Sequence, residues 1–307
     1  MTNASRPNDS SARGFLTAGV IILIGAAALL VGDRETDPGP PSDASTVTPL
    51  AAFDETFTPV GDAIGEGGLP KRVRHEPTGI VLIQVGPGAY LRGSPETEQF
   101  HQKNEERHEV FVRTPFYLAE TELTVGQWRR VMGETPLEQE GDDLPVSGVS
   151  WHRAQDLLDA LNAMSGGGWR LPTEVEWEFA CRAGTTTPFS FGERIDHTLA
   201  NMHGEHPYPD GPRGEFRGGP IAVKSFAPNP WGFYDMHGNL WEWCSDLYVA
   251  HPELGETAKD VPGASRVIRG GGFAAHGKRS RAGYRDGYPP SSPGEKYGVR
   301  LALSVGD

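Results

Sequence analysis

The chain contains very little cysteine. Cys181 and Cys244 are the only two cysteines among 307 residues, and no Cys-x-x-Cys pair is present. This excludes a disulfide-dense scaffold and a zinc site built on paired cysteines. One bridge between the two cysteines stays open at this point, but we expect two buried thiols.

Basic charge is also scarce. The net charge is −13, so the chain has no basic surplus to neutralise phosphates, and its composition disfavours nucleic acid as a partner. The excess of carboxylates is compatible with bound cations, which need oxygen ligands. It is equally compatible with a contribution to solubility alone.

One long hydrophobic run interrupts this polar sequence. Residues 14–32 carry no charge over 19 positions, and about 20 apolar residues cross a bilayer as a helix. Arg6 and Arg13 precede the run and acidic residues follow it, so the positive-inside rule places residues 1–13 in the cytoplasm. A cleaved signal peptide is the alternative, although no small-x-small cleavage site follows the run. The uncleaved helix and the cleaved signal peptide both predict an extracytoplasmic domain, which would be periplasmic in a bacterium. The uncleaved helix also predicts that the chain is a single-pass membrane protein.

The segment that follows is dominated by small and polar residues. Residues 33–77 are rich in Pro, Asp, Ser, Thr and Gly. Such a composition buries too little apolar surface to fold by itself. We therefore predict a disordered linker here, with at most a short ordered piece near residues 53–60.

The remainder of the chain has the pattern of a folded domain. A β-rich run opens it, and capping residues predict helices beginning at Thr124, Ser150 and Thr173. Beyond residue 182 the chain is nearly all turns, and it carries 40 glycines and 26 prolines in total. Because so long an irregular stretch needs more than β-ladders to hold it, bound metal is one candidate. The predicted fold class is α+β: a single loop-rich domain over residues 78–307, with low regular secondary structure, preceded by one transmembrane helix.

Six motifs follow one another along this domain. They are GAYLRGS at Gly88–Ser94, ETELT at Glu120–Thr124 followed by Gln127 and Trp128, PVSGVSW at Pro145–Trp151, RLPTEVEWE at Arg170–Glu178, GFYDMHGNLWEW at Gly232–Trp243, and RVIRGG at Arg266–Gly271 with GVR at Gly298–Arg300. In this order they resemble the formylglycine-generating enzyme, or sulfatase-modifying-factor, family. The resemblance implies a single α+β domain related to C-type lectin folds, with little regular structure and with bound calcium.

The GFYDMHGNLWEW motif suggests a metal site on its own residues. Asp235 and Glu242 flank a Gly-Asn turn, which can bring two carboxylates and intervening carbonyls around one hard cation. The alternative is a tight turn whose acids only cap backbone amides. The resemblance implies calcium here, with the side chains of Asp235 and Glu242 and the carbonyls of Gly238 and Leu240 as ligands.

The resemblance also implies a second calcium site. Its ligands would be the Asn201 side chain, the Met202 carbonyl, Asp210 and the Pro212 carbonyl. Asp210 is assigned to this site only because a glycine, Gly211, follows it.

The loop after RVIRGG departs from the family pattern. In the family, two loop cysteines bind one copper ion and oxidise a cysteine of a substrate sulfatase to formylglycine with oxygen, and soft sulfur suits copper. Here Gly272 stands in the place of the family's serine, Ala275 in the place of the first cysteine, and the second cysteine has no counterpart. Alanine offers no ligand and no redox centre. Copper and cysteine-dependent oxidation are therefore not expected, and no catalytic residue is assigned.

A cationic run follows in the same loop. His276, Arg279, Arg281 and Arg285 could line a cleft that binds an anion, a glycan or an acidic peptide. The alternative is a set of structural arginines that bridge loops. By the resemblance, Trp241 would form the floor of this cleft. His203 and His206 lie in a separate loop, and we interpret them as solvated side chains.

Three functional hypotheses follow. The first is a calcium-stabilised binding or scaffold module that engages an envelope protein, peptide or glycan. The second is a family enzyme with a cysteine-free oxidoreductase reaction, using His276 and a recruited metal. The third is formylglycine generation on sulfatases.

Overall fold

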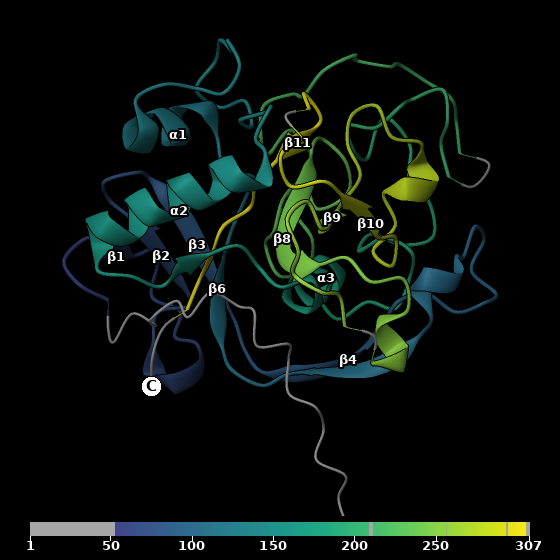
Figure 1. Ribbon diagram of the computed structural model, residues 1–307, viewed down its shortest axis with the longest axis horizontal. Helices are drawn as coiled ribbons and strands as arrows, with labels where there is room; N and C mark the ends of the chain where they lie inside the picture. The colour runs from purple at the N-terminus through teal and green to yellow at the C-terminus, as the bar shows by residue number, and fades with distance from the viewer. Residues whose placement is uncertain (1–52, 209–210, 256, 293, 305–307) are drawn as a thin grey trace, which may run out of the picture. The chain divides into compact units, whose positions relative to one another are not determined.

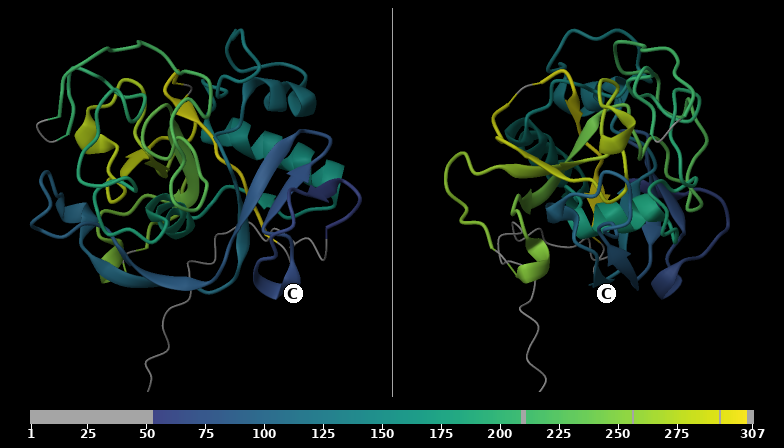
Figure 2. Two further views of the ribbon diagram at one scale, coloured as in Figure 1. Left: turned by 180° about the vertical axis from the view of Figure 1, so that it is seen from behind. Right: turned by 90° about the vertical axis from the view of Figure 1, so that its right-hand side faces the viewer.

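The computed structural model describes residues 53–208, 211–255, 257–292 and 294–304 (Figures 1 and 2). Residues 14–32, where the sequence predicts a transmembrane helix, and the first part of the predicted linker lie outside these ranges. Within the described ranges no helix is long and apolar enough to cross a membrane.

The largest element is a six-stranded sheet in the order β1-β2-β3-β6-β12-β7. Its strands are β1 (Phe57–Pro59), β2 (Arg72–His75), β3 (Ile80–Val85), β6 (Phe116–Ala119), β12 (Ala302–Leu303) and β7 (Trp169–Arg170). All neighbours pair antiparallel. Because β12 comes from the end of the domain and pairs between β6 and β7, the sheet is complete only when the last residues are in place.

Two helices cover the two faces of this sheet. The even positions of β3, such as Leu82, pack with α2 (Trp151–Ser165), which lies across the sheet in Figure 1. Its odd positions, such as Ile83, pack with α3 (Glu174–Arg182) on the opposite face. Side chains of a strand alternate between faces, so one apolar run supplies both cores.

Smaller elements complete the domain. A second sheet has the order β10-β9-β8-β11, and β4 pairs with β5 as a separate ribbon. These strands are β8 (Trp241–Leu247), β9 (Arg266–Arg269), β10 (Asp286–Tyr288), β11 (Tyr297–Gly298), β4 (Gly88–Arg92) and β5 (His108–Val112). The remaining helices are α1 (Val125–Met132) and the 3-10 turns η1 (Glu66–Gly68), η2 (Lys103–Glu105), η3 (Pro252–Leu254) and η4 (Gly277–Arg279).

The three predicted helix starts are confirmed. Thr124 caps α1 and Thr173 caps α3, each in a capping box with the residue three positions later. Ser150 caps α2 through its hydroxyl, which accepts from the backbone N–H of Arg153. The helix α2 ends at Gly166, whose φ of 77° is the left-handed conformation typical of a helix end.

The predicted linker is too long at its C-terminal end. Residues 57–59 and 72–75 form β1 and β2, and β2 pairs with β3 in the six-stranded sheet. Phe57 and Val73 are buried in the core. The prediction failed because composition averaged over 33–77 hides a short strand whose alternate residues point inward. The domain therefore begins well before residue 78.

Buried ion pairs hold the irregular part of the domain. Glu174 accepts hydrogen bonds from Arg285 at 2.7 and 2.8 Å and from Arg269 at 3.3 Å. Glu178 pairs with Arg182 at 2.8 Å and with Arg269. All five side chains are buried. These charge-assisted bonds join α3 to β9 and to the loop before β10, where few ladders exist.

Candidate functional site

The loop that departs from the family pattern is tightly packed. Gly271 has φ +76°, and a Cβ there would lie 2.4 Å from Ser280 Oγ, so only glycine fits. The N–H of Ala275 donates to the carbonyl of Gly272 at 2.7 Å, and the Ala275 methyl is buried in the core with Trp241. The position where the family has its first cysteine is thus filled by an inert methyl group.

The predicted cleft residues separate into two groups. Arg281 is fully buried and donates to Glu105 at 2.7 and 2.9 Å and to Glu98 at 2.6 Å. Arg285 is buried against Glu174. Their placement in a ligand cleft is wrong, and the alternative of structural arginines is confirmed for both, because a guanidinium can satisfy several acceptors at once. His276 and Arg279 are exposed.

Trp241, which the resemblance implied as the floor of a cleft, lies beside the loop. A Cβ on Gly272 would approach Trp241 Cδ1 at 3.2 Å, and the Trp241 ring is 6.0 Å from that of Tyr284. Its side chain is only 6% exposed. Trp241 therefore supports the loop from below and offers little surface to a ligand.

Glu242 is engaged by protein groups. Its carboxylate accepts from the Arg300 guanidinium at 2.8, 2.9 and 3.1 Å and from Trp177 Nε1 at 2.6 Å, and all three side chains are buried. A cation set against Glu242 would face a guanidinium in a medium of low dielectric constant, which is unfavourable. The predicted role of Glu242 as a calcium ligand does not fit this structure.

Asp235 caps a backbone amide, as the alternative interpretation of the motif predicted. Its Oδ2 accepts from the Lys224 N–H at 2.9 Å, and burial raises the pKa of Asp235 to about 6. The Leu240 N–H donates to Glu122 at 2.8 Å, and the Gly238 N–H to the Gly270 carbonyl at 2.8 Å. Hydrogen bonds of the protein thus hold the turn together.

Asn201 is different, because one of its polar atoms lacks a partner. Its Nδ2 donates to Gly219 O at 3.0 Å and to Asn239 Oδ1 at 2.9 Å, while the buried Oδ1 accepts no hydrogen bond. Since buried polar atoms are nearly always satisfied, Asn201 Oδ1 is an available oxygen ligand. Met202 is buried and Pro212 is exposed, and Asp210 lies outside the described residues. An amide oxygen of this kind is a ligand type that a hard cation such as calcium accepts.

The cysteines cannot substitute for the missing pair. Cys181 and Cys244 are both buried and free, as predicted. Burial raises the pKa of each thiol. The protonated form is therefore favoured over the thiolate, which is the form that binds copper or reacts.

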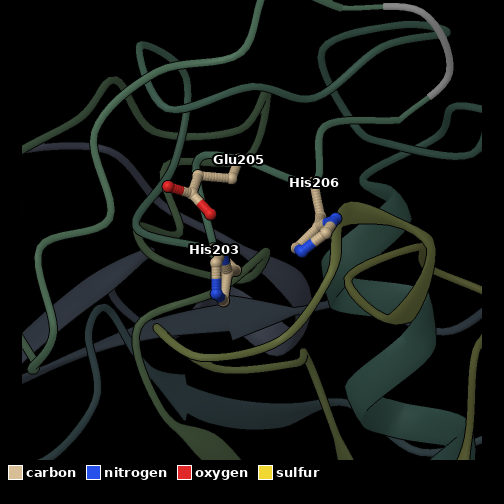
Figure 3. Close-up of side chains that lie close together, drawn as sticks. All are labelled: His203, Glu205 and His206. Carbon is tan, nitrogen blue, oxygen red and sulfur yellow. The ribbon is translucent and has the colours of Figure 1, made fainter.

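His203 and His206, which the sequence analysis interpreted as solvated side chains, lie with Glu205 in a cluster beside the loop. One ligand atom from each of His203, Glu205 and His206 lies within 4.8 Å of the others, and Figure 3 shows the three side chains gathered together. His276 stacks on His206 with ring centroids 3.9 Å apart. The H-x-E-H spacing was the available signal, but only the fold places the 203–206 loop against residue 276.

The fold and these contacts define a class of protein: a loop-rich mixed α/β domain with few helices, tied together by buried ion pairs. The family model for the sulfatase-modifying factor enzyme 1-like domain, FGE-sulfatase, matches residues 67–305. The chain belongs to this family. The match begins at residue 67, in agreement with the early start of the domain.

Three known proteins illustrate the relationship. The chain is 34% identical over 186 residues to the formylglycine-generating enzyme of Bos taurus, covering 57% of this chain and 48% of that protein. It is 36% identical over 182 residues to the inactive C-alpha-formylglycine-generating enzyme 2 of Mus musculus, covering 58% and 55%. The chain spans about half the length of such curated relatives. The structure of PvdO from Pseudomonas aeruginosa superposes with a TM-score of 0.64 at 24% identity, covering 74% of this chain and 95% of that one, which shows a shared fold.

Proposed function

We propose that this chain is an extracytoplasmic binding or scaffold module of the family, anchored in the membrane by residues 14–32, without cysteine-dependent copper oxidation. One observation carries the proposal: Ala275 fills the position of the first cysteine with a buried methyl group. The two cysteines of the chain are buried and lie in other elements, α3 and β8. The similarity to a relative named as inactive is compatible with this function. The partner would be an envelope protein, peptide or glycan.

The test is co-expression with a peptide that carries the cysteine motif of a sulfatase. We expect mass spectrometry to find the cysteine of the peptide unmodified, because copper has no thiolate ligands at the loop. A formylglycine-generating enzyme that retains both loop cysteines serves as the positive control in the same cells. An aldehyde formed by this chain would contradict the proposal.

We further propose that calcium binds at Asn201 and stabilises the C-type-lectin-like arrangement of loops. The unpartnered Asn201 Oδ1 supports this site, and a ligand that binds only the folded state stabilises it by about 2.7 kcal/mol at a hundredfold excess over Kd. Chelation should therefore lower the Tm of the wild-type protein, and Asn201→Ala should remove the response to chelator. A Tm that is the same with and without calcium would exclude the site.

The cysteine-free enzyme remains the second candidate, and the histidine cluster beside the loop favours it. A copper or iron ion retained through purification would support this candidate over the binding module. Metal analysis of the purified protein separates the two.

A further inference from the structure

We propose that His203, Glu205 and His206 form a binding site for a divalent transition-metal ion beside the loop that lacks the family's cysteines. Ligand atoms from the three side chains lie within 4.8 Å of one another (Figure 3). Two imidazoles and one carboxylate are a set that holds zinc or non-haem iron with an open coordination position. Calcium prefers oxygen ligands, so this site differs in chemistry from the one at Asn201.

The backbone holds this loop in one place. The His206 N–H donates to the His203 carbonyl at 2.8 Å, which closes a tight turn. The His203 N–H donates to Ala275 O at 2.9 Å, and the Gly277 N–H donates to His206 O at 2.9 Å. The turn is therefore bonded to the 275–277 loop at both ends, so its side chains are oriented before any ion arrives.

His203 has a fixed ring and an unpartnered nitrogen. Its ring stacks on Phe216 with centroids 4.2 Å apart and planes 6° apart, which fixes the plane of the imidazole. Its Nδ1 is buried and has no hydrogen-bond partner. Because a buried polar atom without a partner is costly, an ion at this nitrogen would remove an existing penalty.

His276 extends the cluster from the other loop. It stacks on His206 at 3.9 Å and lies 5.8 Å from the His203 ring. In this position it restricts the rotation of His206. Glu205 and His206 are exposed, so the open position of the ion would face solvent and could take water or the carboxylate of an acidic ligand.

The test is zinc titration of the full chain by isothermal titration calorimetry, with calcium in excess so that oxygen-only sites are occupied. We expect one zinc ion per chain. Glu205→Gln and His206→Gln should each weaken zinc binding by more than about tenfold, and both side chains are exposed, so the variants should fold. His152→Gln, exposed at the start of α2, is the matched control and should bind zinc as the wild type does.

Cobalt provides an independent readout. Co²⁺ bound by the wild type should give visible absorption bands that zinc abolishes and that Glu205→Gln alters. The proposal is overturned if the wild type binds no zinc, or if the double variant Glu205→Gln/His206→Gln binds it as tightly as the wild type. Such a result would not affect the proposed function, which the aldehyde assay tests separately.

Discussion

Glu242→Gln is expected to lower the free energy of unfolding by about 3–5 kcal/mol, the effect of leaving a buried charge without its partner. Arg300 is fully buried, and besides Glu242 it contacts only neutral carbonyls, Ala119 O at 3.0 Å and Tyr234 O at 2.7 Å, among its hydrogen-bond partners. Without the Glu242 carboxylate, Arg300 would keep these dipoles and the electrostatic influence of Glu122 and Asp235, but it would lose its only hydrogen-bonded carboxylate among the described residues. Denaturant unfolding followed by tryptophan fluorescence measures the change.

The matched control is Asp156→Asn. Asp156 forms an ion pair with Arg153 at 3.4 Å, and both side chains are well exposed, at 56% and 37%. Such surface pairs contribute about 0–1 kcal/mol, so the control should be nearly neutral. Glu242→Gln/Arg300→Met should be less destabilised than Glu242→Gln, because the double variant also removes the buried guanidinium that the single variant leaves without its hydrogen-bonded carboxylate.

The same variant separates the two roles considered for Glu242. If Glu242 pairs with Arg300, the loss of stability is equal with and without calcium. If Glu242 were a calcium ligand, most of the difference in stability between the variant and the wild type would disappear in chelator. The wild type would then also lack the stabilisation that calcium provides. That result would contradict the assignment made from the contacts of Arg300.

Phe57→Ala is expected to cost about 3–5 kcal/mol, as for other buried aromatic residues. Phe57 is 6% exposed, and its ring lies 6.0 Å from Trp169, 4.9 Å from His75 and 5.1 Å from Phe53. Removing it would leave a cavity in the core between the sheet and α2. Thermal unfolding should show a Tm lower by roughly 6–20 °C for a domain of this size.

Glu55→Ala is the control for Phe57, because Glu55 lies two residues away and is exposed. It should leave the Tm nearly unchanged. An unchanged Tm in Phe57→Ala as well would contradict the conclusion that β1 is an integral part of the domain. A chain that begins at residue 78 should fail to fold, because β3 would lose its partner β2 and expose an unpaired edge.

Local signals in the sequence were sufficient for the helices and for the loss of the oxidase cysteines. Thr124, Ser150 and Thr173 cap helices through contacts within three residues. The sequence around each cap is therefore enough to predict it. Ala275 is equally direct, since no fold can give an alanine a thiolate. Arg170, which opens the motif RLPTEVEWE, likewise has a partner close in sequence: it pairs with Glu176 at 2.6 and 2.7 Å.

Long-range contacts decided the rest. Glu242 could be read as a metal ligand until Arg300, 58 residues away, was found against it. Arg281 and Arg285 could be read as cleft residues until Glu105 and Glu174 were found beside them. The identity of an acidic residue or an arginine does not reveal whether its partner is an ion, a ligand or a buried countercharge. Only burial and geometry separate these cases.

The sequence by itself determined the family, the starts of three helices, the hydrophobic run at residues 14–32 and the absence of a cysteine pair in the loop. The tertiary structure alone decided that residues 57–75 add two strands to the main sheet, that buried ion pairs fasten the loops, and that His203, Glu205 and His206 meet His276. The physical reason is distance along the chain. Caps and apolar runs act between neighbours, whereas ion pairs and metal ligands depend on which loops the folded core brings together.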